Sequence, residues 1–285
     1  VRKEKNLADF GGTSVPSHGH LLNNDVKNFQ LEWTHRGTNW LNELQFAYSK
    51  VDNGTPRTSE GPEINLSNGT DFGTIAALGT NSFEQNDSQK SFLIKDNVTF
   101  YSSKNVIKAG FRVSFDKYER TEDSYSNGGY FFNAANYSTF DSSVPYGARV
   151  SVIDFRPASA KNTQIGLFVQ DDWKPDDHWT VNAGIRWDYE TNAKNEKFVT
   201  PANVAAALRA YPGWKAAGIN PEDYISTGDN RHPFGGAFQP RLGVSYDVKG
   251  DRDLVFFAGA GRYYDRPLFI TAGIETVKNY YQKVV

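Results

Sequence analysis

The amino-acid sequence predicts an all-β fold: an antiparallel up-and-down transmembrane β-barrel wall of about eight strands, a partial barrel with long extracellular loops. Three patterns predict it. Apolar and polar residues alternate over several segments, short and long connections alternate along the chain, and aromatic residues lie near the segment ends. The longest apolar run, LVFFAGAG at 254–261, is far shorter than the roughly 20 residues of a membrane-spanning helix.

The clearest predicted strand is WTVNAGIRWDYE at 179–190. Its odd positions, from Trp179 to Tyr189, are apolar or aromatic, and its intervening positions are polar or glycine. A helix would scatter the apolar side chains over opposite faces, whereas a strand places all of them on one face. The same alternation, in places weaker, predicts strands at 29–33, 44–48, 92–100, 107–115, 165–173 and 238–246. We expect an eighth strand, of undefined phase, at 254–264.

The connections between these strands predict four hairpins. Short polar turns are expected at 37–39, 102–105, 174–178 and 249–253, whereas the segments 51–90, 118–161 and 190–236 are long. Loops beyond about 12–15 residues are uncommon in compact soluble domains. Hairpin connectivity places all long segments at one end of the sheet, which is typical of outer-membrane barrels with short periplasmic turns and long extracellular loops.

This pattern divides the chain into three segments. Residues 1–28 are expected to be a loop or the connection from a preceding strand, 29–264 to be the β-barrel segment, and 265–285 to start the next loop or strand. The sequence does not begin with Met, and its first residues lack the apolar core of a secretory signal. We therefore expect a processed chain or a piece of a longer one.

Aromatic residues at the strand ends predict two girdles, one at each lipid interface. The alternative is ordinary cross-strand aromatic pairing in a soluble sheet, and the asymmetry of the loops favours the membrane. The predicted interface aromatics are Trp40, Tyr48, Tyr101, Tyr118, Trp173, Trp179 and Tyr189. The side chains expected to face lipid are Trp179, Val181, Ile185, Trp187, Phe111 and Val113. The opposite face carries charges of both signs, which suits a water-filled or plugged lumen.

Composition and motif spacing exclude several other functions. Lys and Arg number 31 against 33 Asp and Glu, for a net charge of -2, so nucleic acid is not an expected partner. The absence of Cys excludes disulfides and Cys-ligated metals. His18 and His20 have a chelating spacing but no third ligand nearby, which favours a solvated terminal segment. The acidic set lacks the spacing of a calcium loop; it comprises Asp171, Asp172, Asp176 and Asp177. We expect no enzyme, no catalytic or metal-binding residues and no cofactor.

The long loops carry aromatic residues that could contact a ligand, because exposed rings supply rigid contact area. The alternative is that these rings pack the loops onto one another. The candidate ligand-binding residues are Tyr130, Phe131, Phe132, Tyr211, Trp214 and Tyr224. Within the last loop, PANVAAALRAY predicts a short helix that opens at Pro201 and stops before Pro212.

Two stretches of the chain resemble the TonB-dependent outer-membrane receptors, in particular their Oar-like members. They are IGLFVQDDWKPDDHWTVNAGIRWDYE at 165–190 and FQPRLGVSYDVKGDRDLVFFAGAGRYYDRP at 238–267. In that family, similar strand and turn text occurs in the same order and spacing. The matching residues belong to the wall and carry no ligand specificity.

The resemblance implies a parent protein that imports a ligand across the bacterial outer membrane with energy from TonB. Such receptors look like barrels of about 22 strands around a plug, whereas eight strands and no plug-like region are predicted here. We therefore expect a barrel fragment, with membrane lipid, the plug of the parent chain, TonB and an unidentified ligand as partners. The alternatives are a passive outer-membrane barrel or adhesin, and a soluble all-β protein that binds a glycan or peptide.

Overall fold

The main element of the structure, a computed structural model, is one large antiparallel sheet. The structure describes residues 1–69, 73–135, 141–151, 157–266 and 270–280. Within them, nine strands pair in the order β1-β2-β3-β6-β7-β10-β11-β12-β13. The strands are β1 (Arg2–Ala8), β2 (His20–Arg36), β3 (Trp40–Gly54), β6 (Phe83–Tyr101), β7 (Asn105–Ser124), β10 (Ala158–Trp173), β11 (Trp179–Glu190), β12 (Ala237–Asp247) and β13 (Val255–Gly261).

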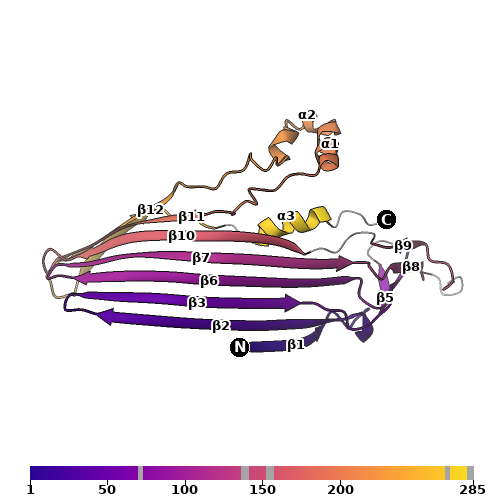
Figure 1. Ribbon diagram of the computed structural model, residues 1–285, viewed down its shortest axis with the longest axis horizontal. Helices are drawn as coiled ribbons and strands as arrows, with labels where there is room; N and C mark the ends of the chain where they lie inside the picture. Colours follow the sequence, from indigo (N-terminus) through magenta and orange to yellow (C-terminus); the bar gives the residue numbers. More distant parts are fainter. Residues whose placement is uncertain (70–72, 136–140, 152–156, 267–269, 281–285) are drawn as a thin grey trace.

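A smaller sheet lies at the loop end of the large one (Figure 1). Over the described residues it has four strands in the order β5-β4-β8-β9, in which β4 and β8 pair in parallel. It therefore joins the segment between β3 and β6 to the segment between β7 and β10. Its strands are β4 (Glu63–Ser67), β5 (Thr74–Gly79), β8 (Gly129–Asn133) and β9 (Gly147–Arg149).

The described helices lie between β1 and β2, between β11 and β12, or after β13. The predicted loop helix is confirmed as α1 (Ala202–Ala210), which follows Pro201. The others are η1 (Pro16–His18), α2 (Gly213–Ala216), η3 (Pro221–Tyr224) and α3 (Ile270–Tyr280). Among the residues that the structure describes, no helix has the length and apolar character to cross a membrane.

The short turns gather at one end of the large sheet and the long connections at the other, as hairpin connectivity predicted (Figure 1). We call these the turn end and the loop end. Several strands are longer than predicted, and β7 runs nine residues beyond Phe115, the last residue of its alternating pattern. Where a strand extends into water, the side chains on both of its faces are polar. The alternation therefore stops there, while the backbone hydrogen bonds of the sheet continue.

The two terminal segments differ from the sequence prediction. Within 1–28, expected to be a loop or a connection, β1 pairs with the first half of β2 over seven residue pairs from Arg2–Val26 to Ala8–His20. Within 265–285, expected to begin a loop or strand, Ile270–Tyr280 forms the helix α3. Residues 267–269 and 281–285 lie outside the described part of the chain.

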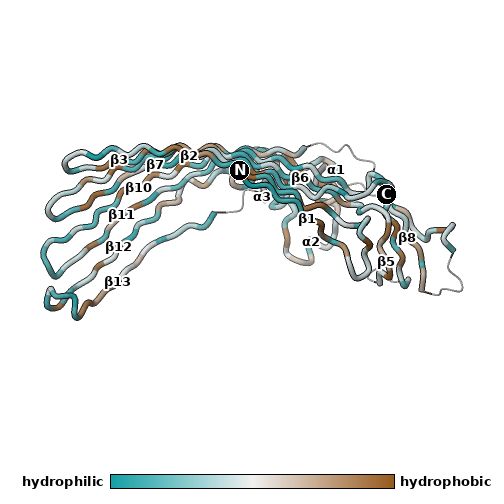
Figure 2. Tube along the Cα trace, turned by 90° about the horizontal axis from the view of Figure 1, so that it is seen from below, coloured by the Kyte–Doolittle hydropathy of each residue, from teal (hydrophilic) through white to brown (hydrophobic). Residues whose placement is uncertain are grey.

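The large sheet is curved and open. In Figure 2 the turn ends of successive hairpins step from β3 through β11 and β12 to β13. In the described residues β1 and β13 are the two edge strands and do not pair with each other, so the expected strand at 29–33 does not close a barrel with the strand at 254–264.

Candidate functional site

One side of the large sheet is apolar, and we call it the apolar face. Strand register fixes its membership, because residues directly paired across strands share a face. Phe46, Ile94, Val113, Ile165 and Tyr189 form one such row across five strands. All six side chains predicted to face lipid belong to this face by their register.

The apolar face is exposed. Phe29 is 64% exposed, and Phe111, Leu167, Ile185 and Leu242 are also exposed. A contiguous apolar surface of this extent does not persist in water. The soluble alternative required a second sheet over this face, and within the described residues no strand lies over it.

The predicted interface aromatics separate into two groups. Trp40, Tyr48, Trp173, Trp179 and Tyr189 alternate in phase with the apolar face and lie near strand ends. Near the turn end, Trp179 packs against Tyr246 on the neighbouring strand, with ring centroids 4.6 Å apart.

Tyr101 and Tyr118 do not fit the interface prediction. Tyr101 pairs with Val106, on the polar side of the sheet, and the preceding Phe100 occupies the apolar face instead. Tyr118 is also in phase with the polar side and is only 4% exposed. The phase of each strand already contained this information, because both residues fall out of step with their apolar neighbours.

The other side of the sheet, the polar face, carries a network of ion pairs. Asp188 on β11 accepts hydrogen bonds from Arg186, at 2.7 Å, and from Gln239 on β12, at 2.6 Å. Arg266, which follows β13, reaches the same carboxylate at 2.9 Å and Glu190 at 3.4 Å. The side chains of Arg186, Asp188 and Arg266 are all at most about one-third exposed. The charges of this cluster are therefore satisfied by one another.

The helix α3 packs on β7 and β10. Tyr118 lies below it and donates a hydrogen bond to Asp87. On the same face Ser91 donates to Asp116, at 2.5 Å, and Asn162 donates to Glu190, at 2.7 Å. Polar groups on this face of β6, β7 and β10 are thus buried and hydrogen-bonded.

The candidate ligand-binding aromatics fall into two clusters at the loop end. Tyr211 and Trp214 contact edge to face, with centroids 5.0 Å apart, and Tyr211 and Tyr224 are exposed.

The second cluster is built from β8, where Tyr130, Phe131 and Phe132 are consecutive. Tyr130 is exposed, whereas Phe131 packs between Tyr125 and Tyr146 below the Arg149 guanidinium. Phe131 therefore fits the alternative interpretation, in which the aromatic rings hold loops together. Figure 1 shows β8 apart from α1 and α2, so the two clusters do not form one site.

The two histidines near the N-terminus are buried, which makes the expectation of a solvated segment wrong. His20 lies 2.9 Å from the Asp9 carboxylate and 2.6 Å from the Phe83 carbonyl oxygen. Within the described ranges, no group of three or more His, Asp or Glu side chains could hold a metal ion.

Sequence reasoning missed Arg266 as a member of the polar face. It lies 78 residues from Asp188 in the sequence, beyond the last alternating segment. The stretch ending in RYYDRP, which carries the receptor resemblance, was the only signal near it.

Comparison with known proteins agrees with this geometry. The sequence matches the family described as "Outer membrane beta barrel domain" over residues 2–281. In structure the chain is similar to the outer membrane transporter YddB from Escherichia coli, with a TM-score of 0.58 and 10% sequence identity. The similarity covers 94% of this chain and 29% of the transporter chain, and at this identity it concerns the fold alone. A search of curated proteins finds no match. An exposed apolar face, a polar opposite face and a match over nearly the whole chain lead to one conclusion: the chain belongs to the outer membrane β-barrel domain family.

Proposed function

We propose that this chain is part of the barrel wall of a TonB-dependent outer-membrane receptor, which takes up an unidentified ligand across the outer membrane with energy supplied by TonB. The observation that carries the proposal is the polar face. Its ion pairs around Asp188 suit a wide lumen filled by water or a plug, where charges remain hydrated or paired. A narrow barrel of eight strands would bury them among packed side chains.

The open edges of the sheet support a larger barrel. Unpaired backbone groups on β1 and β13 would each cost several kcal/mol in lipid. Further strands are therefore needed to close the wall. The hairpins β10–β11 and β12–β13 also carry the two stretches that resemble the TonB-dependent receptors.

The partners of this proposal follow from its parts. Membrane lipid surrounds the apolar face, a plug domain of the parent chain lies against the polar face, and TonB supplies the energy. Barrel families of this kind are typically not enzymes, and we assign no catalytic residue to the wall.

Binding of TonB tests the proposal against a passive barrel or adhesin. The natural full-length protein is mixed with the purified periplasmic domain of TonB, and its conductance is measured in a planar bilayer in potassium chloride. We expect saturable binding of TonB and no steady conductance across the bilayer. Steady conductance without TonB binding would identify a passive pore, and absence of both would favour an adhesin.

For ligand contact we propose the exposed rings of Tyr130, Tyr211 and Tyr224, with Trp214 supporting Tyr211. We also propose that Trp40, Tyr48, Trp173, Trp179 and Tyr189 anchor the wall at the lipid interfaces. Glycan and peptide arrays probed with the full-length protein and with Y211A/Y224A test the ligand contact. Array binding should be lost in this variant and kept in Y263A, which removes an exposed ring outside the candidate group.

A further inference from the structure

Five lysines lie side by side across five strands of the apolar face. Register pairs Lys27 with Lys50, Lys50 with Lys90, Lys90 with Lys117, and Lys117 with Lys161. We call these residues the lysine row. Like charges directly opposite each other destabilise a sheet, so a row of five requires compensating negative charge.

The lysine row lies where the apolar band ends. A row of aromatic residues lies on the same face, two residues closer to the turn end. We call it the aromatic row; its members are Phe29, Tyr48, Phe92 and Phe115. On β6, ten residues separate Phe100, near the turn end, from Lys90. At roughly 3.3 Å per residue and a strand tilt of about 40°, this separation corresponds to about 25 Å, the height of an outer-membrane apolar band. The lysines are therefore level with the headgroups of the outer leaflet.

Three of the lysines have carboxylate partners in the next row of the same face. Lys27 lies 3.6 Å from Asp25, and Lys50 lies 2.5 Å from Asp52. Lys117 lies 2.7 Å from Glu119 and donates a hydrogen bond to it.

The other two lysines have no such partner. In the next row, Ser88 stands beside Lys90 and Ser159 beside Lys161. Among the residues that the structure describes, neither lysine lies within ion-pair distance of a carboxylate, and Lys90 interacts with Glu119 only at longer range.

A groove runs between the lysine row and the aromatic row. It has a volume of about 240 Å³, and Lys90, Lys117, Lys161, Tyr48, Phe92 and Phe115 lie along it. Asp116 also borders the groove, but its register places the carboxylate on the polar side of the sheet, where it accepts hydrogen bonds from Ser91 and Ser114. The groove thus has positive charge on one side and apolar rings on the other.

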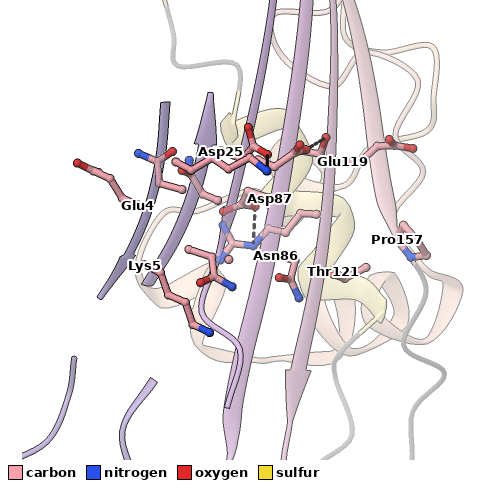
Figure 3. Close-up of a pocket in the computed structure, with 16 residues that line it drawn as sticks. Glu4, Lys5, Asp25, Asn86, Asp87, Glu119, Thr121 and Pro157 are labelled. Atoms are coloured by element: carbon pink, nitrogen blue, oxygen red, sulfur yellow. Dashed lines mark hydrogen bonds and ion pairs between the residues drawn. The ribbon is translucent and has the colours of Figure 1, made fainter. Parts of the chain in front are cut away.

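Figure 3 shows the neighbouring hollow, farther toward the loop end, with α3 behind the strands. That hollow is lined by Asp25, Asp52 and Glu119 as well as Lys3 and Lys5, so its carboxylates disfavour an anion. An anion therefore fits best in the groove between the lysine row and the aromatic row.

We propose that this groove binds the phosphate groups of phosphorylated glycolipid in the outer leaflet. Lys90 and Lys161, which form no ion pair in the described structure, supply their ammonium groups to phosphate, with Lys117 between them. Phe92 and Phe115 contact the apolar part of the lipid. The row is confined to β2–β10: at the loop ends of β11 and β12 the terminal residues are Glu190 and Ala237. One side of the wall is thereby selective for anionic lipid. This inference depends on membrane insertion and is independent of TonB.

Lipid binding to the natural full-length protein in detergent tests the inference. Native mass spectrometry compares lipid A that carries its phosphates with dephosphorylated lipid A of the same acyl composition. The phosphorylated lipid should bind, and K90Q/K161Q should weaken its binding about tenfold or more, because two ammonium contacts are removed. The charge-matched variant K104Q/K174Q, which alters turn-end lysines, should bind as the wild type does.

Two further measurements keep the test decisive. K90R/K161R should restore binding, which separates loss of charge from misfolding. Excess inorganic phosphate should not displace the lipid, because phosphate alone lacks the apolar part that the aromatic rings contact. Equal binding of dephosphorylated lipid A, unchanged binding by K90Q/K161Q, or displacement by inorganic phosphate would overturn the inference.

Discussion

Arg266 and Asp188 tie the segment after the last strand to the centre of the polar face, with the guanidinium Nη2 2.9 Å from the carboxylate Oδ1. The same carboxylate is held by Arg186 on its own strand and by Gln239 on the next strand. One side chain thus organises β11, β12 and the chain that follows β13. Removal of this carboxylate should weaken the contacts among all three segments.

The first prediction concerns this carboxylate. Asp188→Asn removes the negative charge, which leaves the partly buried guanidinium of Arg186 without a carboxylate partner and that of Arg266 with Glu190 alone. We expect a loss of about 1–3 kcal/mol in the free energy of unfolding. Urea unfolding in lipid vesicles, followed by tryptophan fluorescence, measures it. Asp177→Asn, in an exposed turn, is the matched control, and equal losses in both variants would contradict the prediction.

The second prediction concerns the apolar face. Ile185 is 44% exposed on this face, and arginine there would place a charge in hydrocarbon. Ile185→Arg should cost roughly 2–4 kcal/mol if the position lies near the bilayer midplane. Asn182→Arg, on the polar face of the same strand, should be tolerated. Folding yield and unfolding free energy in vesicles distinguish the two, and a similar cost for both would argue against lipid contact.

The third prediction concerns the turn between β10 and β11. Asp176 accepts hydrogen bonds from the backbone N–H groups of Trp179 and His178, each at 2.9 Å. The Trp179 bond, followed by the His178 bond, lowers the pKa of Asp176 below its usual value.

A folded-state pKa below the unfolded one means that the carboxylate stabilises the turn at neutral pH. This stabilisation disappears as the pH falls through the folded pKa, below about 4. Asp176→Ala should therefore lower stability at neutral pH, and the difference from the wild type should shrink in acid. Unfolding curves at several pH values measure it, and a pH-independent difference would contradict the assigned role of charge.

The fourth prediction concerns the contact of α3 with the sheet. A Cβ atom on Gly273 would lie 2.7 Å from the ring of Tyr118, which is buried and hydrogen-bonded to Asp87. Alanine favours an isolated helix over glycine by about 1 kcal/mol, but here the close contact should dominate. Gly273→Ala should lower the hydrogen-exchange protection of α3. Equal or higher protection would show that the Tyr118 ring can shift away from the added methyl group at little cost in free energy.

Much of the wall could be predicted from sequence, because side chains alternate sides with a period of two. From Trp179 to Tyr189 this period alone assigned every side chain to a face, and the order of short and long connections assigned the two ends. The pattern failed where both faces of a strand meet water: it missed β1 and the loop-end extensions of β6 and β7. Applied strictly, however, the alternation would have excluded Tyr101 and Tyr118 from the lipid interface, because both residues fall on the polar side of their strands.

The candidate sites depended on long-range pairing, which no local pattern records. Lys27 and Lys161 belong to one row only because the register of four successive strand pairs aligns them, and a shift of one residue would move a strand's side chains to the other face. Asp188 met Arg266 only through the return of the chain after β13. Which side of the sheet a strand residue takes can be read from the alternation, because alternation is a local property. Which charges become neighbours depends on the register, because contacts between distant strands set it.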